Sequence, residues 1–171
     1  TTDSSFATNG NKPAIVLNGN NLNTSGLTLS STADGSTIRG LLITNFQQNG
    51  IRIDAGSDGN TIAGNYIGKL TSSGTLGTTT VGLDGIHVEG ANNIIGGATA
   101  ADRNLIAGST GDAIRLNGEA SDGNIIQGNW VGLGANGSTV LGTGSDGIYI
   151  SGGGDNNQVG GSNPGEGNTV V

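Results

Sequence analysis

Apolar and polar residues alternate over short stretches along the whole chain, and no stretch of useful length shows the 3.6-residue period of a helix. The recurring element is a small residue followed by apolar, variable and apolar positions. It appears as GLTL from Gly26, GIRI from Gly50, GIHV from Gly85, AIRL from Ala113 and GIYI from Gly147. A period of two is typical of strands, so the chain is predicted to consist of short strands.

These five positions mark the starts of successive coils. Each coil is expected to hold up to three short strands, separated by turn clusters of Gly, Asn, Asp and Ser. In the coil that starts at Gly50, we expect strands over Ile51–Ile53, Thr61–Ala63 and residues 66–67. Strands this short are unstable alone, so the coils must stack about 4.8 Å apart and pair in parallel. The predicted fold is all-β: a single-stranded right-handed parallel β-helix, or β-solenoid, of about five to six coils.

A longer repeat aligns asparagines from different coils. The segment NTIAGNYIG from Asn60 recurs as NIIQGNWVG from Asn124, 64 residues later. One aligned column holds Ser36, Asn60, Asn93, Asn124 and Asn157, and a second holds Leu41, Asn65, Asn104, Asn129 and Asn168. Because stacked amides can hydrogen-bond from coil to coil, we expect both columns to form structural asparagine ladders.

A column of aspartates precedes the first asparagine column. It holds Asp34, Asp58, Ala91, Asp122 and Asp155, each followed by Gly or Asn. Asp followed by Gly or Asn is typical of tight turns with positive φ. Asp58, Asp122 and Asp155 have a second interpretation as calcium ligands, since calcium binds carboxylate oxygens. The turn role explains them without a metal, so we expect no cofactor and keep calcium as the alternative.

Several of these units resemble a known family. GNTIAGNYIG, GANNIIGG followed by RNLIAGSTGDAI, and NNQVGGSNPGEGNTV resemble the repeats of pectin-lyase-like right-handed β-helices in large bacterial secreted or surface proteins. KPAIVLNGN, GLTL and STIRGLLITNF resemble the first coils of such arrays. The resemblance covers residues 13–171 and implies the same fold and an extracellular or cell-surface location. It implies no single activity, because the superfamily holds lyases, hydrolases, epimerases, tailspikes and adhesin stalks.

We expect one domain over residues 1–171. Residues 1–13 would be an N-terminal cap or lead-in, and residues 69–83 and 133–145 would be loop insertions that lengthen two coils. The terminal coils of a solenoid expose unpaired edges unless they are capped, and neither end of the chain resembles a capping helix. The chain is therefore expected to be a segment of a longer array or a subunit that associates end to end.

Composition excludes several classes of protein. The 35 glycines argue against helices, and the absence of a three-residue glycine period, with only 2 prolines, excludes collagen. A net charge of −7 with 6 Lys plus Arg argues against nucleic-acid partners. No apolar run approaches the roughly 18 residues of a membrane-spanning helix, so we expect no membrane insertion. The chain has no Cys, which excludes disulfides and thiol chemistry.

One outward column collects residue types that bind ligands. Thr28, Arg52, His87, Arg115 and Tyr149 share a strand position, and Asp54 and Glu89 lie two residues further along their strands. Stacking would place the three bases about 5 Å apart. Arg52, His87, Arg115, Tyr149, Asp54 and Glu89 are thus candidate ligands of an acidic sugar or another anion. The alternative is a solvated face whose charges offset one another.

We expect no catalytic residues. Pectate-lyase-type enzymes would need clustered acids with an Arg or Lys base, and polygalacturonase-type enzymes would need paired Asp residues near a His; neither motif is present. His87 is the only histidine, and no G-x-S-x-G element accompanies it.

A second outward stripe is apolar. It holds Leu42, Tyr66, Leu105 and Trp130, with Thr61, Ile94 and Ile125 nearby. These side chains should point outward if Ile62, Ile67, Ile106, Ile126 and Val131 point inward. Tyr66, Leu105 and Trp130 are therefore expected to form an exposed apolar face. Contiguous exposed apolar patches are uncommon, so the insertions at 69–83 and 133–145, a partner chain or a stacked sugar should cover this face.

The expected function is that of a non-catalytic structural or adhesive extracellular module: a stalk, an adhesin or a filament-forming segment. The alternative is a carbohydrate-active enzyme or a binder of acidic polysaccharide that uses the outward Arg and His residues. The expected partners are neighbouring repeats or further copies stacked end to end, with polysaccharide as a possible ligand.

Overall fold

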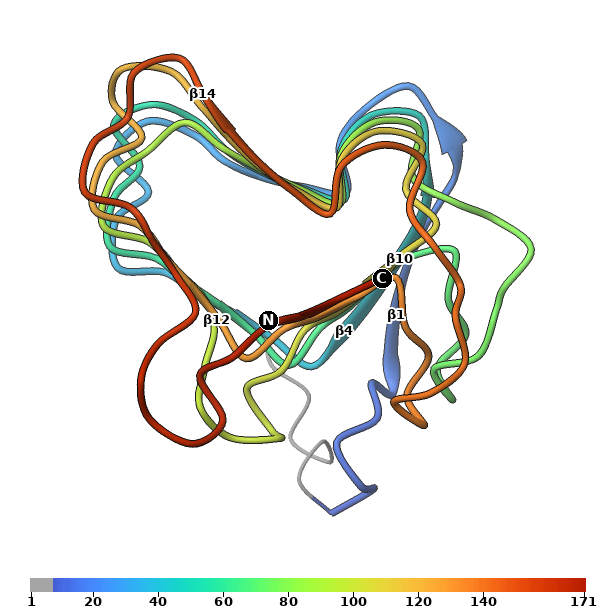
Figure 1. Ribbon diagram of the computed structural model, residues 1–171. Coiled ribbons are helices and arrows are strands. Elements are labelled where there is room, and N and C mark those ends of the chain that lie inside the picture. The colour runs from blue at the N-terminus through green and yellow to red at the C-terminus, as the bar shows by residue number, and fades with distance from the viewer. Residues whose placement is uncertain (1–7) are drawn as a thin grey trace.

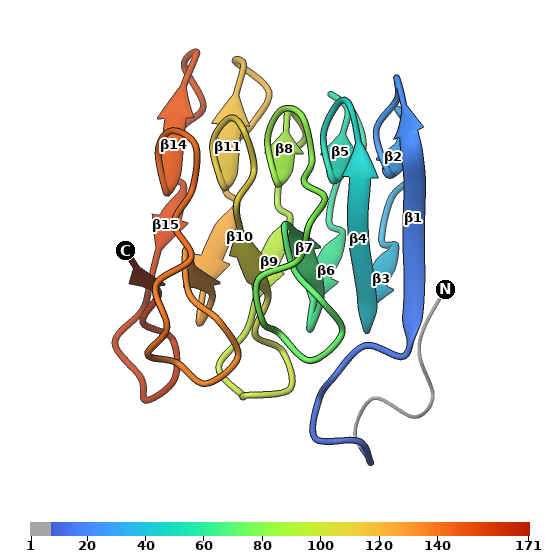
Figure 2. The same ribbon diagram turned by 90° about the vertical axis from the view of Figure 1, so that its right-hand side faces the viewer.

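The computed structural model describes residues 8–171, which form a right-handed parallel β-helix, as predicted. Seen along the axis, the chain follows nearly the same outline in every coil (Figure 1). Seen from the side, the strands of successive coils lie next to one another (Figure 2). No helix in the described part of the chain has the length and apolar character needed to span a membrane.

The strands form three sheets, which we name after their first strands. The β1 sheet contains β1 (Ile15–Leu22), β4 (Leu41–Phe46), β7 (Tyr66–Gly68), β10 (Leu105–Ala107), β13 (Trp130–Val131) and β16 (Thr169–Val170). The β2 sheet contains β2 (Leu27–Leu29), β5 (Ile51–Ile53), β8 (Ile86–Val88), β11 (Ile114–Asn117) and β14 (Ile148–Ser151). The β3 sheet contains β3 (Thr37–Arg39), β6 (Thr61–Ala63), β9 (Ile94–Gly96), β12 (Ile125–Gln127) and β15 (Gln158–Val159). All of these strands pair in parallel.

The strands expected in the second coil are confirmed, and β7 is one residue longer than expected. Of the lead-in expected over residues 1–13, residues 1–7 lie outside the described part of the chain.

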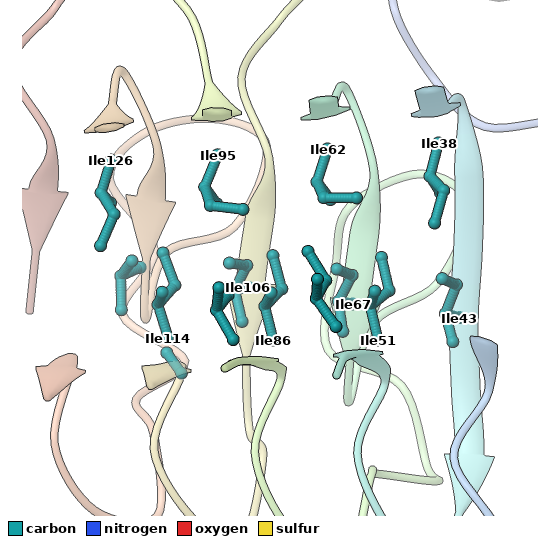
Figure 3. Close-up of a cluster of buried hydrophobic side chains, with 14 of the residues drawn as sticks. Ile38, Ile43, Ile51, Ile62, Ile67, Ile86, Ile95, Ile106, Ile114 and Ile126 are labelled. Atoms are coloured by element: carbon teal, nitrogen blue, oxygen red, sulfur yellow. The ribbon is translucent and has the colours of Figure 1, made fainter. Parts of the chain in front are cut away.

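The core is a stack of branched aliphatic side chains between the three sheets (Figure 3). The residues expected to point inward, Ile62, Ile67, Ile106, Ile126 and Val131, are all fully buried. Each residue lies directly against its equivalents in the neighbouring coils, as the register of Ile67, Ile106 and Val131 shows. Burying one such side chain stabilises the fold by about 1.5–3 kcal/mol, so the aliphatic stack holds the coils together.

Both predicted asparagine ladders are present. The Oδ1 atom of Asn93 accepts the backbone N–H and the Nδ2 group of Asn60, both at 2.9 Å. In the second column, Asn104 Oδ1 accepts the backbone N–H of Asn65 at 3.0 Å. Six members are fully buried, namely Asn60, Asn65, Asn93, Asn104, Asn124 and Asn129. The amides therefore satisfy main-chain groups at two corners of each coil, where the strand ladders are interrupted.

The aspartate column forms the tight turns expected of it. The residues after it, Gly35, Gly59, Asn92, Gly123 and Asn156, all have φ between 57° and 65°. The carboxylates also connect coils, because Asp34 Oδ1 accepts the backbone N–H of Asp58 at 2.8 Å. Asp58 Oδ1 in turn accepts the N–H of Ala91 at 2.8 Å. These aspartates act as turn residues and as acceptors for the next coil.

The insertions at 69–83 and 133–145 cover the outside of the β1 sheet (green and orange in Figure 1). They lie side by side, since the N–H of Ala135 donates to the carbonyl of Gly74 at 2.9 Å. Their residues Leu70, Ala135 and Leu141 pack in one apolar cluster with Leu42, Tyr66, Leu105, Ala107 and Trp130.

This cover corrects the expectation of an exposed apolar face. Tyr66 and Leu105 are only 4% exposed, and Trp130 is half-buried. Of the nearby outward residues on the β3 sheet, Ile94 is 36% exposed, and Thr61 and Ile125 are half-buried. The two insertions therefore remove most of the apolar stripe from solvent, as the first of the three expected covers.

Candidate functional site

The candidate ligand-binding residues come together on the outer face of the β2 sheet. Its register aligns Thr28 with Arg52, Arg52 with His87, His87 with Arg115, and Arg115 with Tyr149. Five equivalent positions on five strands thus form one continuous column. We call these five residues the outward column.

A second polar column lies beside it and was not singled out from the sequence. It occupies the position just before the small residue of each coil, held by Ser25, Asn49, Asp84, Asp112 and Asp146. Asp84 donates its N–H to Asn49 Oδ1 at 3.0 Å, and Asp112 donates its N–H to Asp84 Oδ1 at 2.9 Å. We call these five residues the corner column. Its signal in the sequence is a Ser, Asn or Asp before Gly or Ala in every coil.

The two columns line one hollow of about 340 Å³. Its lining includes Arg52, Asp84, His87, Asp112 and Arg115. These residues lie where the chain enters the β2 sheet, at the indentation in the outline of the coils (Figure 1). Asp84 and Asp112 are nearly buried, while Asp146 is exposed.

Carboxylates surround Arg52 and His87. Arg52 Nε donates to Asp54 Oδ1 at 2.5 Å and Nη2 donates to Glu89 Oε2 at 3.0 Å, and the bond to Asp54 is the main cause of its raised pKa. His87 lies between two acids, with Nδ1 2.9 Å from Asp84 and Nε2 3.2 Å from Glu89. Glu89 therefore bridges the bases of two successive coils.

Arg115 is held less tightly. Its Nη1 lies 3.5 Å from Asp112 Oδ2, and its guanidinium carbon lies 5.0 Å from the centre of the Tyr149 ring. Its Nε is buried without a hydrogen-bond partner. Arg115 is thus the member of the outward column with a buried donor that has no partner.

The charges of this site limit its chemistry. Asp54, Asp84, Glu89 and Asp112 provide four carboxylates, against two guanidinium groups and one imidazole. An incoming anion must therefore compete with carboxylates that already hold the bases. Both ring nitrogens of His87 lie against carboxylates, so neither Ser145 of the hollow nor Thr28 of the outward column is paired with a base that would activate it. The arrangement favours a structural network of ion pairs over acid–base or covalent catalysis.

The described residues contain no cluster of side chains of the kind that a calcium site needs. No group of three or more His, Cys, Asp or Glu within residues 8–171 could hold a metal ion. Asp122 Oδ1 accepts the backbone N–H of Asp155 at 2.6 Å, which is the same coil-to-coil contact that Asp58 makes with Ala91. The turn geometry accounts for Asp58, Asp122 and Asp155.

Removing divalent cations is therefore expected to leave stability unchanged. Thermal unfolding followed by circular dichroism, with and without excess EDTA, should give the same Tm within error. A Tm that falls with EDTA and recovers when calcium is added would contradict the turn role as the full explanation of the aspartate column.

The fold and its three polar corners define the chain as a β-solenoid. It matches no protein-family model, no curated protein and no solved structure. The functional argument therefore depends on the contacts of its own residues.

Proposed function

We propose that this chain is a non-catalytic structural or adhesive module of an extracellular or cell-surface protein, in the manner of pectin-lyase-like β-helix repeats. The observation that carries the proposal is the pairing of Arg52 and His87, each with two carboxylates. Bases held in this way connect neighbouring coils and leave no general base free for a substrate.

The connections between coils support a mechanical role. Amide or carboxylate columns join the coils at all three corners, as the contacts of Asn93, Asn104 and Asp84 illustrate. A rod joined in this way resists bending and local unfolding, because opening one coil breaks contacts to both of its neighbours. Such stiffness suits a stalk or spacer, and the loops outside the β1 sheet would supply the variable surface.

Activity screening tests this proposal. The purified chain is expected to release no unsaturated or reducing ends from a panel of uronate and neutral polysaccharides, beyond a heat-denatured control. Progressive release of either kind of end by the native chain alone would contradict the non-catalytic proposal.

Carbohydrate binding at the outward column is the second candidate. The 340 Å³ hollow and the unpartnered Nε of Arg115 favour it. In this case the chain would bind uronate oligosaccharides without cleaving them, and Arg52→Ala combined with Arg115→Ala would abolish the binding. Arg39→Ala is the matched control, since Arg39 pairs with Asp102 at 2.8 Å on the β3 sheet. Binding that survives the double substitution, measured by calorimetry, would exclude this site.

A further inference from the structure

A second, smaller hollow of about 180 Å³ lies outside the β1 sheet. Its lining comes from strands and loops that are far apart in sequence. Tyr66, Leu105 and Trp130 come from β7, β10 and β13, Arg103 precedes β10, and Ala135 belongs to the loop at 133–145. This hollow faces away from the β2 sheet, so it is separate from the outward and corner columns.

Arg103 brings an unpaired positive charge to this hollow. Its guanidinium carbon lies 4.0 Å from the centre of the Trp130 ring, and its Nε donates to the carbonyl of Gly128 at 3.3 Å. Among residues 8–171, the arginines at 39, 52 and 115 each pair with a carboxylate, whereas Arg103 pairs with none. Burial lowers the pKa of Arg103, and no carboxylate of the described residues offsets that effect.

Tyr66 brings a second unused donor. The residue is 4% exposed, and its hydroxyl makes no hydrogen bond to another described residue, while the oxygen itself still contacts solvent. Burial raises the pKa of this hydroxyl, so it keeps its proton at neutral pH. A phenol hydroxyl that lines a hollow and has no protein partner is free to donate a hydrogen bond to a bound acceptor.

We propose that the Arg103 and Tyr66 hollow is a binding site for a small carboxylate. A guanidinium group offers two parallel N–H donors that match the two oxygens of a carboxylate, and the Tyr66 hydroxyl supplies a third donor. One positive charge balances one negative charge, which favours a carboxylate over the more highly charged sulfate or phosphate. The rest of the lining is Gly10, Asn11, Ala100, Leu105 and Ala135, and its apolar side chains limit access of water and strengthen the ion pair.

The site contains its own reporter, because Trp130 is the only tryptophan in the chain. Titration with sodium acetate, at constant ionic strength kept with chloride, is expected to change Trp130 fluorescence with saturation. Tyr66→Phe is expected to weaken acetate binding about five- to tenfold, because it removes one hydrogen bond to a charged group. The phenylalanine keeps the buried ring, so this variant should remain folded.

Arg103→Gln is expected to abolish saturation. Lys69→Gln, which removes one positive charge from a residue that does not line the hollow, is the matched control and should bind acetate like the unchanged chain. Circular dichroism should confirm that each variant is folded. An unsaturable signal, an equal response to chloride, or saturation retained in Arg103→Gln would overturn the site, and so would sulfate that binds as tightly as acetate.

The same titration identifies the source of the carboxylate. N-acetyl-aspartate amide that binds at least as tightly as acetate would support an acidic side chain of a protein partner as the ligand. Acetate binding with exclusion of the amide would support a free small acid. The polysaccharide screen measures the release of chain ends and not binding, so its result and that of the acetate titration are independent.

Discussion

Replacing Asn104 with alanine is expected to lower the free energy of unfolding by about 3–5 kcal/mol, because several buried groups lose their partners at once. Asn104 Oδ1 accepts two hydrogen bonds from Asn65, one from the backbone N–H at 3.0 Å and one from the side-chain Nδ2 at 3.2 Å. Asn104 Nδ2 donates to the carbonyl of Ile62 at 2.8 Å and to Asn129 Oδ1 at 3.0 Å. Asn104 is fully buried, so the alanine variant leaves this corner with unpaired polar groups and too little space for water to replace the amide.

Urea unfolding monitored by circular dichroism measures this loss, provided that the slope m is unchanged by the substitution. Asn23→Ala is the matched control, since Asn23 is exposed and its side-chain contact with Gln48 is 3.5 Å long. The control should change stability by less than about 0.5 kcal/mol. A loss below about 1 kcal/mol for Asn104→Ala would show that the ladder contributes little to the stack.

The asparagine ladders could be predicted because a solenoid converts sequence alignment directly into spatial contact. Residues at equivalent positions of successive coils become neighbours, so aligning Asn65 with Asn104 already places their amides together. The same logic predicted the interior isoleucines and the outward column. Each of these features depends only on a period that the sequence displays.

The features that were missed depend on irregular segments or on local pairing. The burial of Tyr66 and Leu105 depends on the paths of the insertions at 69–83 and 133–145, where the two-residue alternation is lost. The repeat does not mark Asp84 as a site residue, because Asp84 precedes Gly85, the small residue with which its coil begins. Its contact with His87, three residues later, offsets charge on the outward column in a way that alignment alone did not reveal.

Sequence also left Arg103 unexplained, because the stacking of its guanidinium group on Trp130 brings together two residues that are 27 positions apart and come from different coils. Arg103 lies in the longer connection between β9 and β10, which has no counterpart in the preceding coil, where Gly64 and Asn65 suffice. Contacts made by such connections follow from three-dimensional packing. The candidate carboxylate site therefore became visible only in the structure.

The small residue that begins each coil is constrained by the core beside it. A Cβ atom added to Gly85 would lie 2.5 Å from Ile106 Cγ2 and 2.6 Å from the carbonyl oxygen of Ala113. Gly50 faces Ile67 in the same way, with a Cβ at 2.4 Å from Ile67 Cγ2. In the next coil the position holds Ala113, and the register partner of Ile106 there is Val131. Gly147 faces a valine as closely as Gly50 faces an isoleucine, with a Cβ at 2.3 Å from Val170 Cγ1.

Gly85→Ala is accordingly expected to lower the free energy of unfolding by about 1–3 kcal/mol through overpacking. Ile106→Ala alone should cost about 2–5 kcal/mol, because it removes three buried carbon atoms, Cγ2 among them. The double variant should lose less stability than the sum of the two single losses, since alanine lacks the Cγ2 atom that the new methyl group would meet.

A double-mutant cycle measured by urea unfolding isolates this coupling, and Gly85→Ala combined with Ile43→Ala provides the matched control. Ile43 faces Gly26 in another coil, so the control pair should be additive within about 0.5 kcal/mol. Additive losses for Gly85→Ala and Ile106→Ala would show that the carbonyl oxygen of Ala113, and not the core side chain, keeps this position free of a Cβ atom. Coupling confined to the facing pair would instead show that the glycines at the start of each coil are required by the close packing of the isoleucine core.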